Sequence, residues 1–215
     1  MNRTLFFRRP FKKTYFGAFI ILILINFILY GIAFVFPKMN LYLSLNPIAV
    51  IKYKMYWQFV SYMFVHGNFS HLFFNMLGLL IFGFQLERAI GSKEFLLFYL
   101  LTGIFSGIFS FGFYMATGEY NVFLVGASGA LYAVMFAFAV FFPRSVIYVW
   151  GIIPIPSPLL VVIYAVVELG SQIIGAGGNI AHMTHLFGFL AAWLYFVIRM
   201  GVHPIKIWKD TYHLR

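Results

Sequence analysis

Long apolar stretches, separated by short segments that hold most of the charged residues, restrict how this chain can fold more than any other feature. Of the 215 residues, 63% are hydrophobic and only 9% are charged. Soluble domains carry about 25% charged residues, so a soluble chain of this composition could not cover its own core. The composition therefore argues against a soluble enzyme, a disordered chain or a coiled coil, and predicts a protein that crosses a membrane several times.

Six stretches have the length of a membrane-spanning helix, because a hydrocarbon core of about 30 Å needs about 20 apolar residues. They cover residues 15–36, 66–84, 94–116, 125–142, 158–174 and 180–200. We therefore expect an all-α membrane protein that forms a six-transmembrane-helix bundle. A single domain at residues 15–200 would lie between a basic tail at 1–14 and a C-terminal tail at 201–215.

Lysine and arginine are unevenly divided between the two sides of such a bundle. Twelve lysine and arginine residues lie in the tails and in the connections after the second and fourth spans. Only three, Lys38, Lys52 and Lys54, lie on the other side. Positive residues accumulate on the cytoplasmic side, so both termini are expected in the cytoplasm. The net charge of +10 then indicates topology and contact with the lipid bilayer, with no nucleic acid as partner. The short tail favours a bacterial plasma membrane over an organellar one.

Polar side chains inside the spans are candidates for a functional site, because they are costly in a bilayer. With the N-terminus inside, the second, fourth and sixth spans all enter from the outer side. Near those entry points the three spans carry His66, His71, Asn75, Ser128, His182 and His185. Polar groups from three helices at one depth predict a shared site in the outer part of the membrane.

The spacing of these residues predicts which of them face each other. His71 and Asn75 are four residues apart and lie on one helix face. Ser128 stands in the small-residue run at 126–130, and the sixth span carries Gly188 and Ala192, so the two helices can pack closely. Ser128 then lies near His185, which is the minimum for nucleophilic acyl transfer. His71, Asn75 and the Ser128 amide can donate hydrogen bonds to an oxyanion.

The five acidic residues provide no evident third member for this pair. Only Glu168 lies deep in a span, and we expect it to be a neutral, hydrogen-bonded structural acid. The sequence therefore predicts a Ser-His dyad whose imidazole is oriented by packing. Tyr132, one turn after Ser128, can supply an aromatic face for that ring.

Four segments resemble the rhomboid family of intramembrane serine proteases. Residues 66–75 resemble the family's H-x4-H-x3-N helix, residues 126–129 its G-x-S-G motif, and residues 185–188 its H-x-x-G motif. Glu87 resembles a structural glutamate at the end of the second helix. Together these segments extend over residues 57–192, with the spans in the family's order.

The resemblance implies a rhomboid-like bundle with a water-filled cavity open to the outer side. Ser128 would be the nucleophile, and His185 would be the base. The supporting roles would fall to the following residues: His71 and Asn75 in the oxyanion hole, Gly126 in the nucleophile turn, Tyr132 stacked on the base, and Gly188 in the last-helix motif. The family cleaves transmembrane segments of other membrane proteins and uses no metal or organic cofactor.

The chain departs from the family pattern at two positions. It has Trp57-Gln58 where many members have Trp-Arg, and Ala192 where members often have a second glycine. His182 competes with His185 as base, but only His185 is followed by Gly188 as the pattern requires. We expect His182 to be a hydrated residue at the cavity mouth and His66 to anchor a loop.

Three other functions stay open at this point. Four histidines at one level could hold zinc, although no acid accompanies them and no H-E-x-x-H motif is present. A transporter or channel would need polar groups across the whole bilayer, whereas here they cluster on one side. An inactive module that binds transmembrane helices is the third alternative. Replacing Ser128 with alanine separates these functions from proteolysis.

Overall fold

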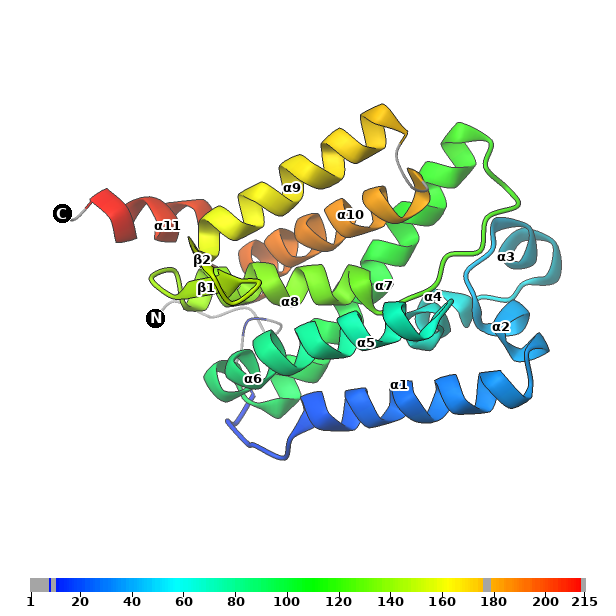
Figure 1. Cartoon of the computed structure of the whole chain (residues 1–215), viewed down its shortest axis with the longest axis horizontal. Helices are drawn as coiled ribbons and strands as arrows, with labels where there is room; N and C mark the ends of the chain where they lie inside the picture. The colour runs from blue at the N-terminus through cyan, green and yellow to red at the C-terminus, as the bar shows by residue number, and fades with distance from the viewer. Residues whose placement is uncertain (1–7, 9–10, 176–178, 214–215) are drawn as a thin grey trace.

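The computed structural model describes residue 8 and residues 11–175 and 179–213, which form a helical bundle (Figure 1). Most of the basic tail predicted at 1–14 and the last two residues of the C-terminal tail lie outside the described residues. The helices and strands have the following bounds: α1 Ala18–Val35, α2 Lys38–Leu43, α3 Pro47–Tyr53, α4 Gln58–Ser61, η2 Tyr62–Phe64, α5 Phe69–Gly78, η3 Leu79–Gly83, α6 Phe84–Ile90, α7 Ser92–Thr117, α8 Ser128–Phe141, β1 Val146–Val149, β2 Ile153–Pro156, α9 Ser157–Ile174, α10 Asn179–Tyr195, η4 Phe196–Met200 and α11 Pro204–His213.

The prediction of a helical membrane bundle is confirmed, but the helices differ in length from the predicted spans. Among the described residues, five helices are long and apolar enough to cross a membrane: Ala18–Val35, Phe69–Ile90, Ser92–Thr117, Ser157–Ile174 and His182–Met200. The fourth predicted span is α8, which has only 14 residues and is therefore about 21 Å long. The count of six spans consequently remains a prediction.

Helix α8 is short because it lies inside the bundle rather than against lipid. It contacts α7, α9 and α10, and eleven of its 14 residues are buried. Irregular backbone before a helix is tolerated at membrane depth when protein surrounds it. Residues 125–127 accordingly precede the helix as an irregular turn instead of forming its first turn.

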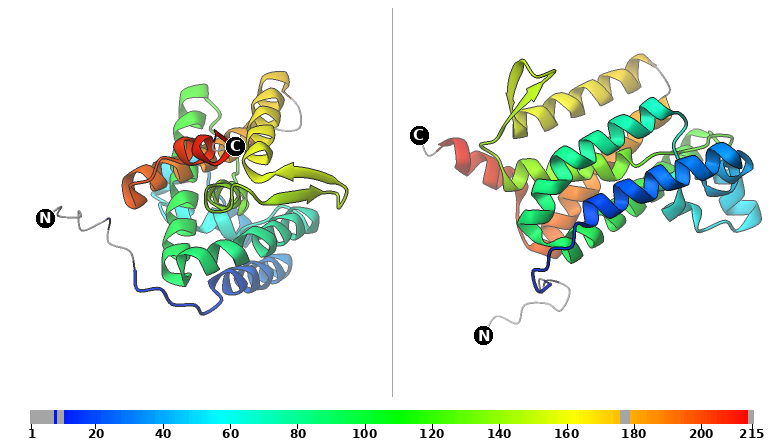
Figure 2. Two further views of the ribbon diagram at one scale, coloured as in Figure 1. Left: turned by 90° about the vertical axis from the view of Figure 1, so that its left-hand side faces the viewer. Right: turned by 60° about the horizontal axis from the view of Figure 1, so that its bottom comes forward.

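Close packing between α8 and its neighbours depends on small residues. A Cβ at Gly188 of α10 would lie 2.2 Å from the carbonyl oxygen of Gly129 in α8, so the two backbones touch. In α7, a Cβ at Gly103 would collide with the Met63 side chain. In contrast, α1 packs on α5 at the edge of the bundle and leaves one face exposed (Figure 2).

The N-terminus of α1 is held by an acid from α6. The backbone N–H groups of Ala18 and Phe19 donate to the two carboxylate oxygens of Glu87, at 2.8 and 2.9 Å. The Ser92 hydroxyl also donates to Glu87, which is fully buried. A carboxylate at a helix N-terminus satisfies donors that have no partner within the helix. This contact fits the structural role expected for Glu87.

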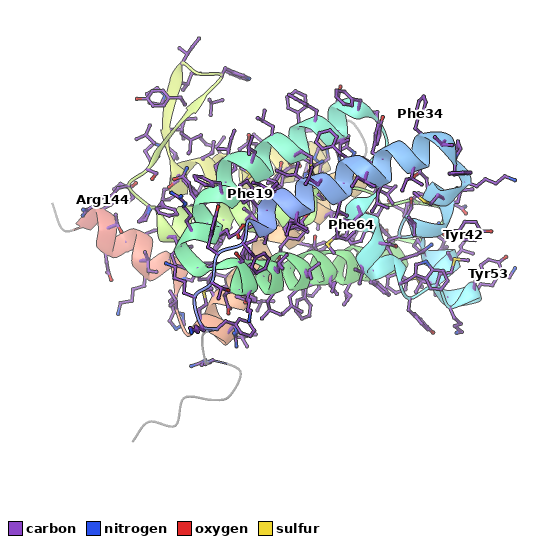
Figure 3. The ribbon with its side chains drawn as sticks, turned by 90° about the horizontal axis from the view of Figure 1, so that it is seen from below. Phe19, Phe34, Tyr42, Tyr53, Phe64 and Arg144 are labelled. Carbon is purple, nitrogen blue, oxygen red and sulfur yellow. The ribbon has the colours of Figure 1, made fainter. Side chains whose placement is uncertain are left out.

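The segment between α1 and α5 folds into short helices at one end of the bundle. Figure 3 shows Tyr42 and Tyr53 at this end, with Arg144 at the opposite end. Gln58, which replaces the arginine of the family pattern, is buried, accepts from the Asn46 N–H at 3.1 Å and donates to the Tyr42 carbonyl at 3.1 Å. Gln58 thus joins the two halves of this segment.

A two-stranded hairpin between α8 and α9 was not predicted from the sequence. Strands β1 and β2 pair antiparallel from Val146↔Pro156 to Val149↔Ile153. The turn places Trp150 at φ 53° and Gly151 at φ 73°. The hairpin projects from the same end of the bundle as α11 (Figure 2). Because two of the four residues in β2 are proline, which is uncommon in paired strands, the sequence did not indicate a strand there.

Candidate active site

The turn before α8 exposes Ser128 at the first position of the helix. Gly126 has φ +115°, a conformation that favours glycine, and its N–H donates to the Tyr62 carbonyl at 3.0 Å. A Cβ at this position would lie 2.6 Å from Nε2 of His71. Gly126 therefore allows both the turn and the approach of His71, as expected for the nucleophile motif.

Ser128 and His185 are brought together as the sequence predicts. The Ser128 Oγ lies 2.8 Å from Nε2 of His185, a normal hydrogen-bond distance. The two residues come from α8 and α10, whose backbones meet at Gly129 and Gly188. The close helix contact therefore sets the distance between the hydroxyl and the imidazole.

Tyr132 stacks on the imidazole of His185. The ring centroids are 4.2 Å apart and the planes differ by only 11°. Tyr132 follows Ser128 by one helical turn, so the same face of α8 carries both side chains. The aromatic face predicted for this ring is therefore present.

The expectation that packing alone orients His185 was wrong, because a carboxylate also contacts the ring. Oε1 of Glu168, in α9, lies 2.8 Å from Nδ1 of His185, and Oε2 lies 2.5 Å from Nδ1 of His182. The Tyr132 hydroxyl donates to the same Oε1. His182 is consequently a partner of Glu168, with 19% of its side chain exposed.

A signal for this contact was present in the sequence. Glu168 precedes the end of α9, at Ile174, by six residues, and His185 follows the start of α10, at Asn179, by six residues. Two antiparallel helices joined by a short connection place such positions about 9 Å from the turn on each side. Equal distance from the connection puts the acid and the histidine at one level.

His71 and Asn75 line the same cavity as Ser128. They stand on α5, whose first turn is capped by Asn68: the Asn68 Oδ1 accepts from the His71 N–H at 2.8 Å. The Asn75 amide donates to the His71 carbonyl at 2.8 Å, within the same helix. The structure thus places both predicted oxyanion donors in the lining of the cavity that also contains Ser128, with the Asn75 amide bonded inside α5.

His66 supports the nucleophile turn from outside the spanning helices. Its Nε2 accepts from the Ala127 N–H at 3.4 Å, and its ring meets that of His71 edge-on at 5.1 Å between centroids. Burial, together with the neighbouring His71, lowers the pKa of His66 to about 3. Because the neutral ring is the form present at ordinary pH, Nε2 is free to accept. This contact fits the loop-anchoring role expected for His66.

A cavity of about 580 Å³ opens over Ser128 and His185. Its polar lining comes from Asn68, from residues of α5, α8 and α10, and from Tyr164 of α9, and the other lining side chains are apolar. The lining residues are Asn68, Ser70, His71, Phe74, Asn75, Leu77, Gly78, Ile81, Phe82, Ser128, Leu131, Tyr132, Met135, Tyr164 and His185. A cavity of this size, with a few polar groups in a largely apolar lining, is typical of a ligand-binding site. Within the part of the chain that the structure describes, no group of three or more His, Cys, Asp or Glu residues is placed to hold a metal ion.

Comparison with known proteins now identifies the family. Residues 53–201 match the family model described as the Rhomboid domain. The chain belongs to the rhomboid family. The match covers more than half of the chain and includes every residue assigned above to the site.

Rhomboid relatives occur in bacteria and fungi. The chain is 32% identical in sequence to YdcA of Bacillus subtilis over 141 residues, which are 65% of the chain. The name of that protein marks it as a candidate rhomboid protease. The chain is 29% identical in sequence to rhomboid-type serine protease 2 of Emericella nidulans over 134 residues, which are 62% of the chain. The chain is 31% identical in sequence to the rhomboid protease AarA of Providencia stuartii over 102 residues, which are 43% of the chain. The matches cover 65%, 25% and 36% of the lengths of these relatives, so the chain corresponds to part of each.

Proposed function

We propose that this rhomboid protein is an intramembrane serine endopeptidase that cleaves transmembrane segments of other membrane proteins. The observation that carries the proposal is the 2.8 Å contact between Ser128 Oγ and His185 Nε2 at a cavity within a bundle of membrane helices. An aligned hydroxyl and imidazole provide a nucleophile and its base. The names of the relatives, which include serine proteases, support the same chemistry.

In the proposed reaction, His185 Nε2 takes the hydroxyl proton as Ser128 Oγ attacks the scissile carbonyl carbon. The C–N bond of the tetrahedral intermediate then breaks, and the imidazolium returns the proton to the leaving amine. Water, activated by the same imidazole, hydrolyses the acyl-enzyme and regenerates the Ser128 hydroxyl. Tyr132, stacked on the ring, limits the rotation of His185 through both half-reactions.

The oxyanion of the intermediate would be bound by the Ser128 N–H, His71 and Asn75. Ser128 begins α8, so its N–H is one of the helix-terminal donors without a partner in the helix. His71 lies against Gly126 on the same side of the turn. The Asn75 amide would exchange its bond to the His71 carbonyl for the oxyanion when substrate binds.

The charge distribution supports an orientation for the protein. Arg88 in the last turn of α6, Lys93 in the first turn of α7 and Arg144 after α8 lie at the same end of the bundle as α11, whereas Lys38, Lys52 and Lys54 lie in the segment between α1 and α5 at the other end. We infer that both termini face the cytoplasm and that the catalytic cavity opens toward the outer side of a bacterial plasma membrane.

Purified protein in lipid vesicles with a model transmembrane substrate tests the proposal. Wild type cleaves the substrate and reacts with a fluorophosphonate probe, which labels an activated serine. Ser128→Ala abolishes both cleavage and labelling, and His185→Ala lowers both by roughly 10³-fold or more. Both variants retain the wild-type melting temperature within a few degrees. Cleavage that persists in Ser128→Ala at the wild-type rate would overturn the proposal.

A further inference from the structure

Glu168 makes contacts that a two-residue mechanism does not require. It stands in the spanning helix α9 with 6% of its surface exposed. A carboxylate in such a position is costly unless it is paired, and an intramembrane acid is a functional candidate by default. Three side chains from two other helices converge on it: Tyr132 of α8, and His182 and His185 of α10.

The chemistry of a carboxylate determines the direction of these hydrogen bonds. An ionised carboxylate has no proton to donate, so the Tyr132 hydroxyl and the Nδ1 atoms of both histidines must be the donors. A proton on Nδ1 of His185 leaves the lone pair on Nε2, which faces Ser128 Oγ at 2.8 Å. Glu168 therefore selects the tautomer that a general base needs.

We propose that Glu168 is a positioning residue that completes a Ser128–His185–Glu168 chain and stabilises the imidazolium formed during the reaction. This inference rests on the function proposed above. When Ser128 attacks, its proton moves to Nε2 of His185, the Nδ1 proton stays on the ring, and the carboxylate stays ionised beside the new positive charge. Glu168 thus acts through His185 and does not touch the reacting atoms.

A purely structural role for Glu168 is the competing explanation, because the same contacts tie α9 to α10. The chain offers a matched control for it. Glu94 is also 6% exposed, accepts from a tyrosine, Tyr195, and pairs with a cation, Arg199, at 2.8 Å. Tyr195 is the last residue of α10 and Arg199 lies in η4, which follows it, so both lie away from Ser128 and His185. Glu94→Gln therefore reproduces the loss of a buried carboxylate without touching the site.

The groups that face His185 come from four elements. They are Ser128 and Tyr132 from α8, Glu168 from α9, His71 from α5 and, through the shared Glu168, His182 from α10. Among these described neighbours, Glu168 carries the only negative charge at neutral pH. Replacing it with glutamine removes the charge that stabilises the protonated ring while retaining the shape of the side chain.

The test compares wild type, Glu168→Gln, Glu168→Asp and Glu94→Gln in vesicles, using substrate cleavage and fluorophosphonate labelling across a pH series. For Glu168→Gln we expect kcat per folded molecule to fall by roughly 100-fold or more at an unchanged KM. Its pH profile should also differ from that of wild type, because the imidazolium formed during the reaction has lost its negative neighbour. Glu168→Asp keeps the charge and retains an intermediate rate, and Glu94→Gln keeps the wild-type rate and profile once corrected for folded fraction.

Proton NMR of the intact protein provides a second measurement that does not depend on the folding of Glu168→Gln. An Nδ1–H donated to a buried carboxylate resonates far downfield. We expect two such signals, one lost in His185→Gln and the other in His182→Gln. The inference is overturned if His185→Gln removes neither signal, or if Glu168→Gln matches Glu94→Gln in rate and pH profile. Wild type that neither cleaves nor labels would instead refute the proposed function, while the NMR signals would still report the contact.

Discussion

Gly188 of α10 lies against Gly129 of α8 so closely that a Cβ at position 188 would be 2.2 Å from the Gly129 carbonyl oxygen. Three residues before Gly188, on adjoining turns of the same helix, His185 meets Ser128 at 2.8 Å. The separation of the two backbones therefore controls the distance between the nucleophile and its base. A change of one methyl group at this contact should affect the chemistry before it affects the fold.

We predict that Gly188→Ala forces α10 away from α8 and breaks the Ser128–His185 hydrogen bond. Overpacking of this kind costs about 1–3 kcal/mol of stability. Fluorophosphonate labelling should fall by at least about tenfold, and the melting temperature should drop by several degrees. Gly112→Ala in α7 is the matched control, because a Cβ there meets nothing within 4 Å. Equal labelling by the two variants would contradict the prediction.

Gly126→Ala should inactivate the serine through two separate effects. Alanine is strained at φ +115°, at a cost of about 1–3 kcal/mol, and its Cβ would lie 2.6 Å from Nε2 of His71. We expect loss of most cleavage and labelling with a modest loss of stability. Gly118→Ala separates the effects, because Gly118 has φ +77° but no atom within 4 Å of an added Cβ. If Gly118→Ala loses as much activity as Gly126→Ala, backbone strain alone is responsible.

The apolar spans and the serine–histidine pair could be predicted because the sequence shows both the hydropathy of each span and how far along its helix each polar residue lies. The rotation of a helix about its axis is encoded less clearly, and this explains why the contact between Glu168 and His185 was not predicted. The depth of Glu168 was readable from the connection between α9 and α10, but which way it faces depends on packing against Tyr132 and His185. The length of α8 was overestimated for a related reason. A helix that is enclosed by protein does not need the length that crossing the hydrocarbon core requires.

Stability should depend on pH through His66. Its pKa is about 3 in the folded protein, lowered first by burial, against an ordinary value near 6.5. Between these values the unfolded chain binds a proton that the folded protein does not, so stability falls as pH decreases from about 6.5, by up to about 1.4 kcal/mol per pH unit.

Melting temperatures at pH 7.5 and pH 5 would measure this effect. His66→Gln keeps a side-chain oxygen that can accept from the Ala127 N–H but cannot titrate, so it should lose less stability on acidification than wild type. His203→Gln, at an exposed histidine before α11, should lose as much as wild type. A wild-type response from His66→Gln would show that other groups cause the acid sensitivity.

Glu87→Gln should loosen α1 from the bundle without changing the site. In wild type the Glu87 carboxylate accepts from the N–H groups of Ala18 and Phe19 and from the Ser92 hydroxyl. A glutamine has one acceptor oxygen and turns an NH₂ group toward buried donors, which costs about 1.5–3 kcal/mol for hydrogen bonds to a charged group. We expect a lower melting temperature and faster proteolysis in the segment before α1, with wild-type labelling of Ser128 in the fraction that remains folded. Asp210→Asn removes an exposed acid in α11 and should leave both measurements unchanged, and an unaltered melting temperature in Glu87→Gln would contradict the anchoring role.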